Sequence, residues 1–186
     1  MLAGMAFIGG FAWWISRHRQ EARKLDPRCW VRCVKRMHRR DWVKLVCLAA
    51  GFTLLMLALV PRAAWFTESA TGVQLVDPER HPATQIFRIS PWLLIGLMLF
   101  VPVVEEWLFR GIVLERLRRF GRFPAVMISA FAFGTFHLLN AGTHFYALVP
   151  PTVAGLVLGC AYLAGGLRIS VLAHIGYNEI LLFGLV

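Results

Sequence analysis

The chain has 186 residues, of which 58% are hydrophobic and only 16% are charged. Soluble domains carry about 25% charged residues, so this composition excludes an ordinary soluble domain and indicates a membrane protein. The net charge of +10 does not indicate nucleic-acid binding, because eleven of the 20 Lys and Arg residues fall in one stretch, Arg17–Lys44, between apolar runs. Such a segment is typical of a cytoplasmic loop that meets anionic membrane lipids.

Six apolar segments approach the ~20 residues that an α-helix needs to cross a bilayer. In chain order they are Leu2–Ile15, Trp42–Phe66, Pro91–Leu117, Phe123–Leu139, Phe145–Ala164 and Ile169–Val186. The sequence therefore predicts an all-α fold, a multi-pass transmembrane helical bundle of about six spans. We divide it into residues 1–90, with the N-terminal spans and the basic loop, and residues 91–186, the core that holds the polar motifs described below.

The basic residues predict the orientation of these spans. Besides Arg17–Lys44, five Lys and Arg residues lie in Arg110–Arg122, and Arg168 precedes the last apolar segment. The sizeable connection on the other side, Arg62–Arg88, balances its few arginines with acidic residues. With six spans, all three basic segments fall on one side, which the positive-inside rule makes cytoplasmic. We expect an integral protein of the bacterial cytoplasmic membrane, because the compact architecture with one basic loop is typical of bacterial proteins.

Three polar patterns interrupt the apolar segments. They are EEWLFR at Glu105–Arg110, FGTFH at Phe133–His137 and HIGYN at His174–Asn178. Burying an ionisable group in a bilayer is costly, so such groups mark functional sites by default. The sequence therefore predicts a polar site inside the bundle.

The first pattern divides its two glutamates into different roles. Glu106 and Arg110 are four residues apart and share a helix face, where a low-dielectric interior favours their pairing. Glu105 points roughly 100° away and lacks a cation. Because two adjacent carboxylates disfavour joint ionisation, Glu105 is suited to act as a general base. Glu106 and Arg110 would give structural support to the site. The alternative is a salt bridge that only locks helices together.

The other two patterns supply imidazole and amide groups. Phe133 lies one turn before His137 on the same face, where its ring can shield the imidazole from lipid. His174 and Asn178 share a face and offer two hydrogen-bond donors to one volume, which suits the stabilisation of an oxyanion. Each pattern alone is also compatible with a polar contact between helices. The presence of all three patterns in this order along the chain favours a catalytic site over separate contacts between helices.

On these motifs the chain resembles the CPBP family of intramembrane proteases, which includes the CAAX prenyl endopeptidases and the bacterial Abi, or bacteriocin-processing, homologues. That family carries EExxxR, FxxxH and HxxxN, or a close variant, on successive transmembrane helices. The resemblance covers residues 91–182. It implies an intramembrane endopeptidase of glutamic type, in which Glu105 and His137 activate a water molecule and His174 and Asn178 stabilise the oxyanion. It further implies a membrane-embedded or lipid-anchored protein or peptide as substrate. We expect no cofactor, because Glu106 is committed to Arg110.

Three alternatives remain open. The nearest is a zinc-dependent membrane protease that uses the same residues, since Glu and His are zinc ligands, although no His-Glu-x-x-His motif is present. A transporter would relay protons or ions through the glutamates, but six spans are few and the halves of the chain show no similarity. A non-catalytic membrane scaffold would use the polar residues only to join helices. The sequence predicts membrane lipids as partners and assigns no oligomeric state.

Overall fold

The computed structural model describes residues 38–184. The chain divides into two compact units, Met1–Val43 and Lys44–Val186, and the second contains all three polar motifs. The described residues are organised into helices and contain no β-strand, which confirms the predicted all-α class. The predicted span Leu2–Ile15 and most of the basic loop lie outside the described residues.

The helices largely follow the predicted apolar segments. They are α4 (Arg39–Thr71), α5 (Pro82–Ile89), α6 (Pro91–Glu106), α8 (Arg122–His137), α9 (Val149–Gly165) and α10 (Leu167–Gly184). Shorter elements join them, namely the π-helix η2 (Trp107–Leu114), α7 (Glu115–Leu117) and the 3-10 helices η3 (Arg118–Phe120) and η4 (Phe145–Leu148). Among the described residues, three helical segments are long and apolar enough to cross a membrane, Arg39–Thr71, Pro91–Phe120 and Phe145–Gly165. The count of six spans stays a prediction.

The connection predicted at Arg62–Arg88 is partly helical. Helix α4 continues through Pro61 to Thr71, and Thr67 Oγ1 donates a hydrogen bond to the carbonyl of Ala63 (2.7 Å) within its last turns. The helix continues to Thr71 although its apolar stretch ends at Phe66. The end of the helix predicted from hydropathy therefore lies too early in the chain. The helix α5 follows, with Pro82 in its first turn and His81 as its N-cap. Proline is favoured at that position because its missing N–H needs no partner.

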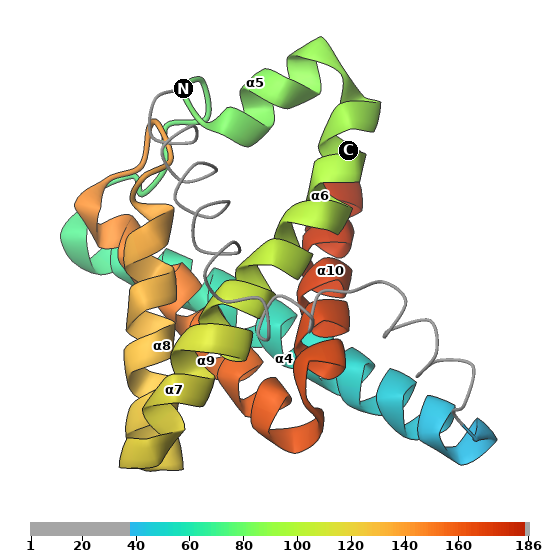
Figure 1. The fold of residues 1–186 in the computed structure, drawn as a ribbon. Helices are drawn as coiled ribbons and strands as arrows, with labels where there is room; N and C mark the ends of the chain where they lie inside the picture. Colours follow the sequence, from blue (N-terminus) through green and yellow to red (C-terminus); the bar gives the residue numbers. More distant parts are fainter. Residues whose placement is uncertain (1–37, 185–186) are drawn as a thin grey trace, which may run out of the picture. The chain divides into compact units, whose positions relative to one another are not determined.

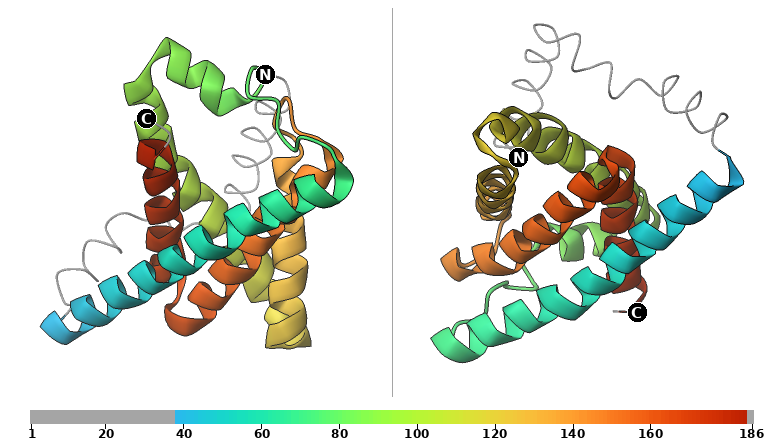
Figure 2. Two further views of the ribbon diagram at one scale, coloured as in Figure 1. Left: turned by 180° about the vertical axis from the view of Figure 1, so that it is seen from behind. Right: turned by 90° about the horizontal axis from the view of Figure 1, so that it is seen from below.

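The long helices of the second unit pack as a bundle. Helix α9 lies between α8 and α10, and α10 also packs on α6. Helix α4 crosses the other helices obliquely, as Figure 2 shows from behind. Its Thr53 Oγ1 donates a hydrogen bond to the carbonyl of Ala173 in α10 (3.1 Å). The buried apolar core includes Met56, Phe109, Phe133, Leu158 and Tyr177.

Helices α8 and α9 approach closely because α9 presents a glycine at the contact. A Cβ atom added to Gly155 would lie only 2.8 Å from the Cα atom of Ala130 in α8. Small residues permit this kind of close backbone packing between helices in membranes. The close contact of α8 and α9 also leaves the carbonyl of Gly155 within reach of Arg110 in η2.

The outer surface of the bundle is strongly apolar. Its exposed large side chains include Leu54, Trp65, Phe66, Trp92, Phe123 and Phe131. Monomeric soluble proteins rarely expose so many large apolar side chains, so this surface fits contact with lipid.

Candidate active site

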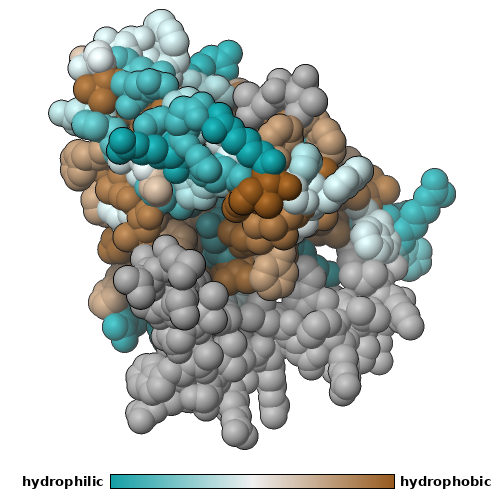
Figure 3. Space-filling model, turned by 90° about the horizontal axis from the view of Figure 1, so that it is seen from above, coloured by the Kyte–Doolittle hydropathy of each residue, from teal (hydrophilic) through white to brown (hydrophobic). Residues whose placement is uncertain are grey.

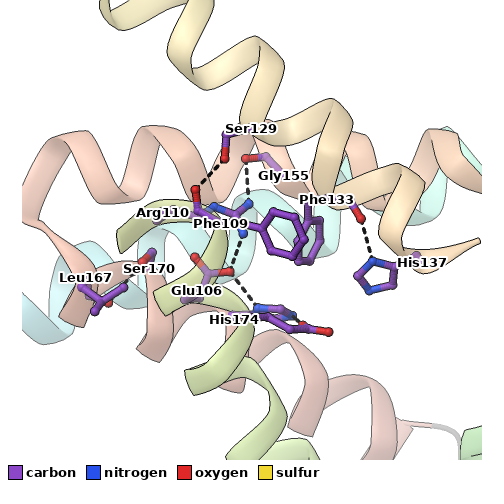
Figure 4. A network of polar contacts seen from close by, with 11 residues as sticks. Glu106, Phe109, Arg110, Ser129, Phe133, His137, Gly155, Leu167, Ser170 and His174 are labelled. Carbon is purple, nitrogen blue, oxygen red and sulfur yellow. Dashed lines mark hydrogen bonds and ion pairs between the residues drawn. The ribbon is translucent and has the colours of Figure 1, made fainter. Parts of the chain in front are cut away.

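The six predicted site residues come from four helical elements that pack on one another, as Figure 4 shows for most of them. They are Glu105 and Glu106 at the end of α6, Arg110 in η2, His137 at the end of α8, and His174 and Asn178 in α10.

Glu106 and Arg110 form the ion pair expected from their spacing. Arg110 Nη1 lies 2.7 Å from Glu106 Oε1, and both side chains are fully buried. Arg110 Nη2 donates a second hydrogen bond to the carbonyl of Gly155 in α9 (3.0 Å). The arginine therefore links three helical elements, and its charge is neutralised inside the bundle.

Arg110 lies in a π-helix, which no sequence pattern predicted. The segment η2 begins directly after Glu106, and the hydroxyl of Ser129 in α8 donates a hydrogen bond to the carbonyl of Phe109 within it (2.8 Å). Short π-helical segments occur frequently at functional sites. Here the segment carries the buried cation of the site.

His174 joins both glutamates across the bundle. Its Nδ1 atom lies 3.0 Å from Glu106 Oε1, and its Nε2 atom lies 3.8 Å from Glu105 Oε2. Glu106 therefore interacts with Arg110 and His174 through the same oxygen. Spacing along the chain gave no sign of this contact, because it joins residues 68 positions apart.

The contact with Glu106 determines which ring nitrogen of His174 carries a proton. A carboxylate paired with arginine is ionised and only accepts hydrogen bonds, so Nδ1 of His174 is the donor. A neutral His174 then presents the lone pair of Nε2 towards Glu105. Donation from Nε2 requires the imidazolium form, whose charge the two neighbouring carboxylates would balance.

His137 is oriented by its own helix. Its Nδ1 atom lies 2.9 Å from the carbonyl of Phe133, which can only accept a hydrogen bond. In the neutral ring, Nδ1 therefore carries the proton and Nε2 is an acceptor. Within residues 38–184 no direct hydrogen bond or ion pair joins His137 to Glu105, the two groups expected to share a water molecule.

Phe133 lies at the centre of the polar residues. Its ring lies 4.5 Å from the ring of His137 and 5.7 Å from the ring of His174, measured between centroids. The guanidinium carbon of Arg110 lies 4.6 Å from the centroid of the same ring. The sequence indicated a shielding role towards His137, and the structure extends the contacts to the other two motifs.

A cavity of about 630 Å³ adjoins these groups. His137, His174 and Asn178 line it, together with Phe133. Glu105 is not among the described lining residues, but it contacts His174, which is. Three of the four predicted catalytic side chains thus line one cavity, and the fourth, Glu105, contacts one of those three.

The described part of the chain contains no group of three or more His, Cys, Asp or Glu side chains arranged to hold a metal ion. The acidic and imidazole groups of the site are instead distributed around Arg110 and Phe133. They can accept a proton, donate hydrogen bonds and balance charge in a largely apolar setting, which is what hydrolysis of an amide requires.

A family model described as type II CAAX prenyl endopeptidase Rce1-like matches residues 87–180. The match covers half of the chain and includes every residue of the three motifs. No curated protein and no solved structure matches the chain.

Proposed function

Because the chain belongs to the Rce1-like family of type II CAAX prenyl endopeptidases, we propose that it is an intramembrane endopeptidase of glutamic type. Membership in this family and the apolar helices make it an integral membrane protease that acts on membrane-associated peptides. The observation that carries the catalytic assignment is the contact of His174 with both Glu105 and Glu106 beside a cavity. We assign the protein to the bacterial cytoplasmic membrane.

In the proposed reaction, Glu105 and His137 activate a water molecule held between them beside the cavity. Glu105 accepts a proton from the water, and Nε2 of His137, free to accept a hydrogen bond, holds the other hydrogen. The water oxygen attacks the scissile carbonyl, and the protonated Glu105 then delivers its proton to the leaving amine. The reaction consumes one water molecule and leaves Glu105 ionised again. General acid–base catalysis of this kind contributes roughly 10²–10⁴-fold in rate.

His174 and Asn178 stabilise the oxyanion that forms. Nε2 of the His174 imidazolium and the side-chain amide of Asn178 donate hydrogen bonds to it. Glu106 holds His174 in position, and Glu105 and Glu106 together balance the charges of Arg110 and the imidazolium. Removing one donor of an oxyanion site costs roughly 10²–10³ in kcat.

The proposal is tested by comparing the termini of membrane proteins in cells that carry wild-type, Glu105→Gln or Glu179→Gln protein. Glu179 is a matched control, because it is another glutamate of the bundle. It belongs to α10, its Oε1 atom is buried, and it lies outside the proposed reaction. We expect one or more protein termini to disappear with Glu105→Gln and to persist with Glu179→Gln. Unchanged termini with normally abundant Glu105→Gln protein would instead favour the membrane scaffold.

The zinc-dependent alternative makes a different prediction. With a glutamic mechanism, cleavage by the purified protein continues after treatment with a metal chelator. Loss of cleavage in chelator, followed by recovery on adding Zn²⁺, would replace the proposed mechanism with a metal-dependent one.

A further inference from the structure

Helix α10 presents one stripe of side chains to the cavity. His174, Tyr177, Asn178 and Leu181 follow the spacing i, i+3, i+4, i+7, which places residues on one face of a helix. All four line the cavity. The proposed reaction uses His174 and Asn178, so Tyr177 is the polar residue of this stripe that the reaction leaves without a role.

The ring of Tyr177 is held where α4 crosses α10. The neighbouring Gly176 forms a notch in α10, since a Cβ atom added there would lie only 2.9 Å from Thr53 Oγ1 of α4. Met56 and Val60 follow Thr53 by one and two turns on the same face of α4. Both belong to the same buried apolar cluster as Tyr177. Packing therefore fixes the position of the phenol ring.

The hydroxyl group of Tyr177 lacks a partner in the protein. Tyr177 is only 9% exposed, and no hydrogen bond joins its hydroxyl to another group within residues 38–184. The side-chain atoms of this range that are both fully buried and without a partner are Glu106 Oε2, Arg110 Nε and Glu179 Oε1. The Tyr177 hydroxyl is not one of them, so it is accessible from the cavity. Buried tyrosines usually form a hydrogen bond through this group.

The cavity is polar at one end and apolar beside Tyr177. Its polar lining residues outside the site come from the last turns of α4 and from the connections after α4 and α8, namely Glu68, His81, Asn140 and Thr143. These connections lie at the upper end of the bundle in Figure 1, and this end gathers hydrophilic residues when seen from above (Figure 3). The wall beside Tyr177 is formed instead by Met56 and Val60. A single polar group on an apolar wall is suited to fix the orientation of a bound molecule.

We propose that Tyr177 is a substrate-binding residue, whose hydroxyl donates a hydrogen bond to a backbone carbonyl of the substrate next to the scissile bond. The inference rests on the proposed protease function, in which His174 and Asn178 bind the scissile carbonyl. Tyr177 lies between them in the chain and lines the same cavity. A donor at this position meets a neighbouring part of the same peptide.

The spacing along α10 supports this assignment. At 1.5 Å per residue, Tyr177 lies about 4.5 Å along the helix from His174. Successive residues of an extended peptide are about 3.3 Å apart. The two side chains can therefore contact carbonyls of adjacent residues. Because every peptide carries these carbonyls, the contact binds the substrate without selecting its side chains.

The inference predicts a specific change in kinetics. Tyr177→Phe removes only the hydroxyl and keeps the packed ring. With a synthetic peptide that spans a cleavage site found in the comparison of termini, we expect KM to rise roughly tenfold, the scale of one lost hydrogen bond. The value of kcat should change little, because the contact is made equally in the ground state and the transition state. An unchanged KM, or a fall in kcat alone, would overturn the inference.

Tyr162→Phe is the matched control, because it makes the same chemical change outside the described lining of the cavity. The hydroxyl of Tyr162 donates a hydrogen bond to Glu115 Oε2 (3.0 Å). Its removal should lower the unfolding midpoint and leave KM unchanged, whereas Tyr177→Phe should raise KM and leave the midpoint unchanged. Equal rises in KM would contradict a specific contact of Tyr177 with the substrate.

Binding without turnover separates this inference from the proposed function. We expect the fluorescently labelled peptide to bind to Glu105→Gln protein without being cleaved, and roughly tenfold more weakly to Glu105→Gln/Tyr177→Phe protein, as measured by anisotropy. Equal affinities would overturn the role of Tyr177 and leave the protease function intact. Cleavage by Glu105→Gln protein at the wild-type rate would overturn the mechanism, while the two affinities still decide the role of Tyr177. If the comparison of termini yields no substrate, the protease function fails and the role of Tyr177 fails with it.

Discussion

At the level of single residues, Glu106 connects the parts of the site. One of its oxygens accepts hydrogen bonds from Arg110 and from His174, and its side chain has no exposure to solvent. The carboxylate therefore neutralises the buried cation and orients the imidazole through the same atom. This arrangement makes the stability of the bundle and the geometry of the site depend on one ion pair.

The buried ion pair predicts a large effect on stability. Arg110→Met removes the cation and leaves Glu106 ionised and unpaired inside the bundle, which should cost about 3–5 kcal/mol of unfolding free energy. The double variant Glu106→Gln/Arg110→Met removes both charges and should recover much of that loss. The measurement is denaturant unfolding of the purified protein in detergent. An Arg110→Met protein as stable as wild type would contradict the assigned role of the pair.

The orientation of His137 predicts an effect on activity without one on stability. In His137→Asn, the side-chain amide can still donate to the carbonyl of Phe133, but the acceptor at the position of Nε2 is lost. We expect kcat to fall by roughly 10²-fold or more, with little change in the unfolding midpoint. Steady-state kinetics on a cleaved substrate provide the measurement. Wild-type kcat in this variant would exclude Nε2 from the reaction.

At the level of helices, sequence patterns predicted contacts within an element far better than contacts between elements. The pairing of Glu106 with Arg110 followed from their spacing on one helix. The bond between His174 and Glu106 could not be predicted, because hydropathy does not specify which helices become neighbours. Phe133, one turn before His137, is the residue whose ring contacts both imidazoles.

The π-helix η2 and the length of α4 were missed for related reasons. Residues 107–114 are mostly apolar, and nothing in their pattern distinguishes a π-helical from an α-helical hydrogen-bond pattern. Helix α4 extends past its apolar stretch because helical hydrogen bonding does not require apolar side chains. Both errors concern backbone geometry at the ends of segments whose existence hydropathy predicted.

The close contact of α8 and α9 predicts a cost for even one methyl group. Gly155→Ala places a Cβ atom against Ala130 and displaces the carbonyl that binds Arg110, so the helices must separate. We expect a loss of about 1–3 kcal/mol of unfolding free energy, the usual effect of overpacking, together with lower activity. Gly96→Ala is the matched control, because a Cβ atom there meets nothing within 4 Å. Equal stability of the two variants would contradict the packing argument.

At the level of the whole molecule, composition and charge were sufficient to predict the fold class. Three short motifs were sufficient to predict the family. The number of spans and the roles of the individual catalytic residues stay predictions. The position of the cavity was beyond sequence reasoning, which predicted only a polar site inside the bundle. The cavity is lined by residues of the connections 72–81 and 138–144, and those connections acquire their positions only through tertiary packing.

Metal removal provides a prediction for the intact protein. Since the proposed mechanism uses only Glu105, His137, His174 and Asn178, chelator treatment of the purified protein should leave both its cleavage rate and its unfolding midpoint unchanged. Rates measured before and after dialysis against chelator, with and without added Zn²⁺, provide the comparison.

Activation of water by Glu105 can be measured in the membrane itself. Wild-type, Glu105→Gln and Glu179→Gln proteins are reconstituted in vesicles with a substrate identified from the termini comparison, and product formation is followed over time. We expect cleavage by wild type and Glu179→Gln, and a rate at least about 100-fold lower for Glu105→Gln. Cleavage by Glu105→Gln at the wild-type rate would contradict this role of Glu105.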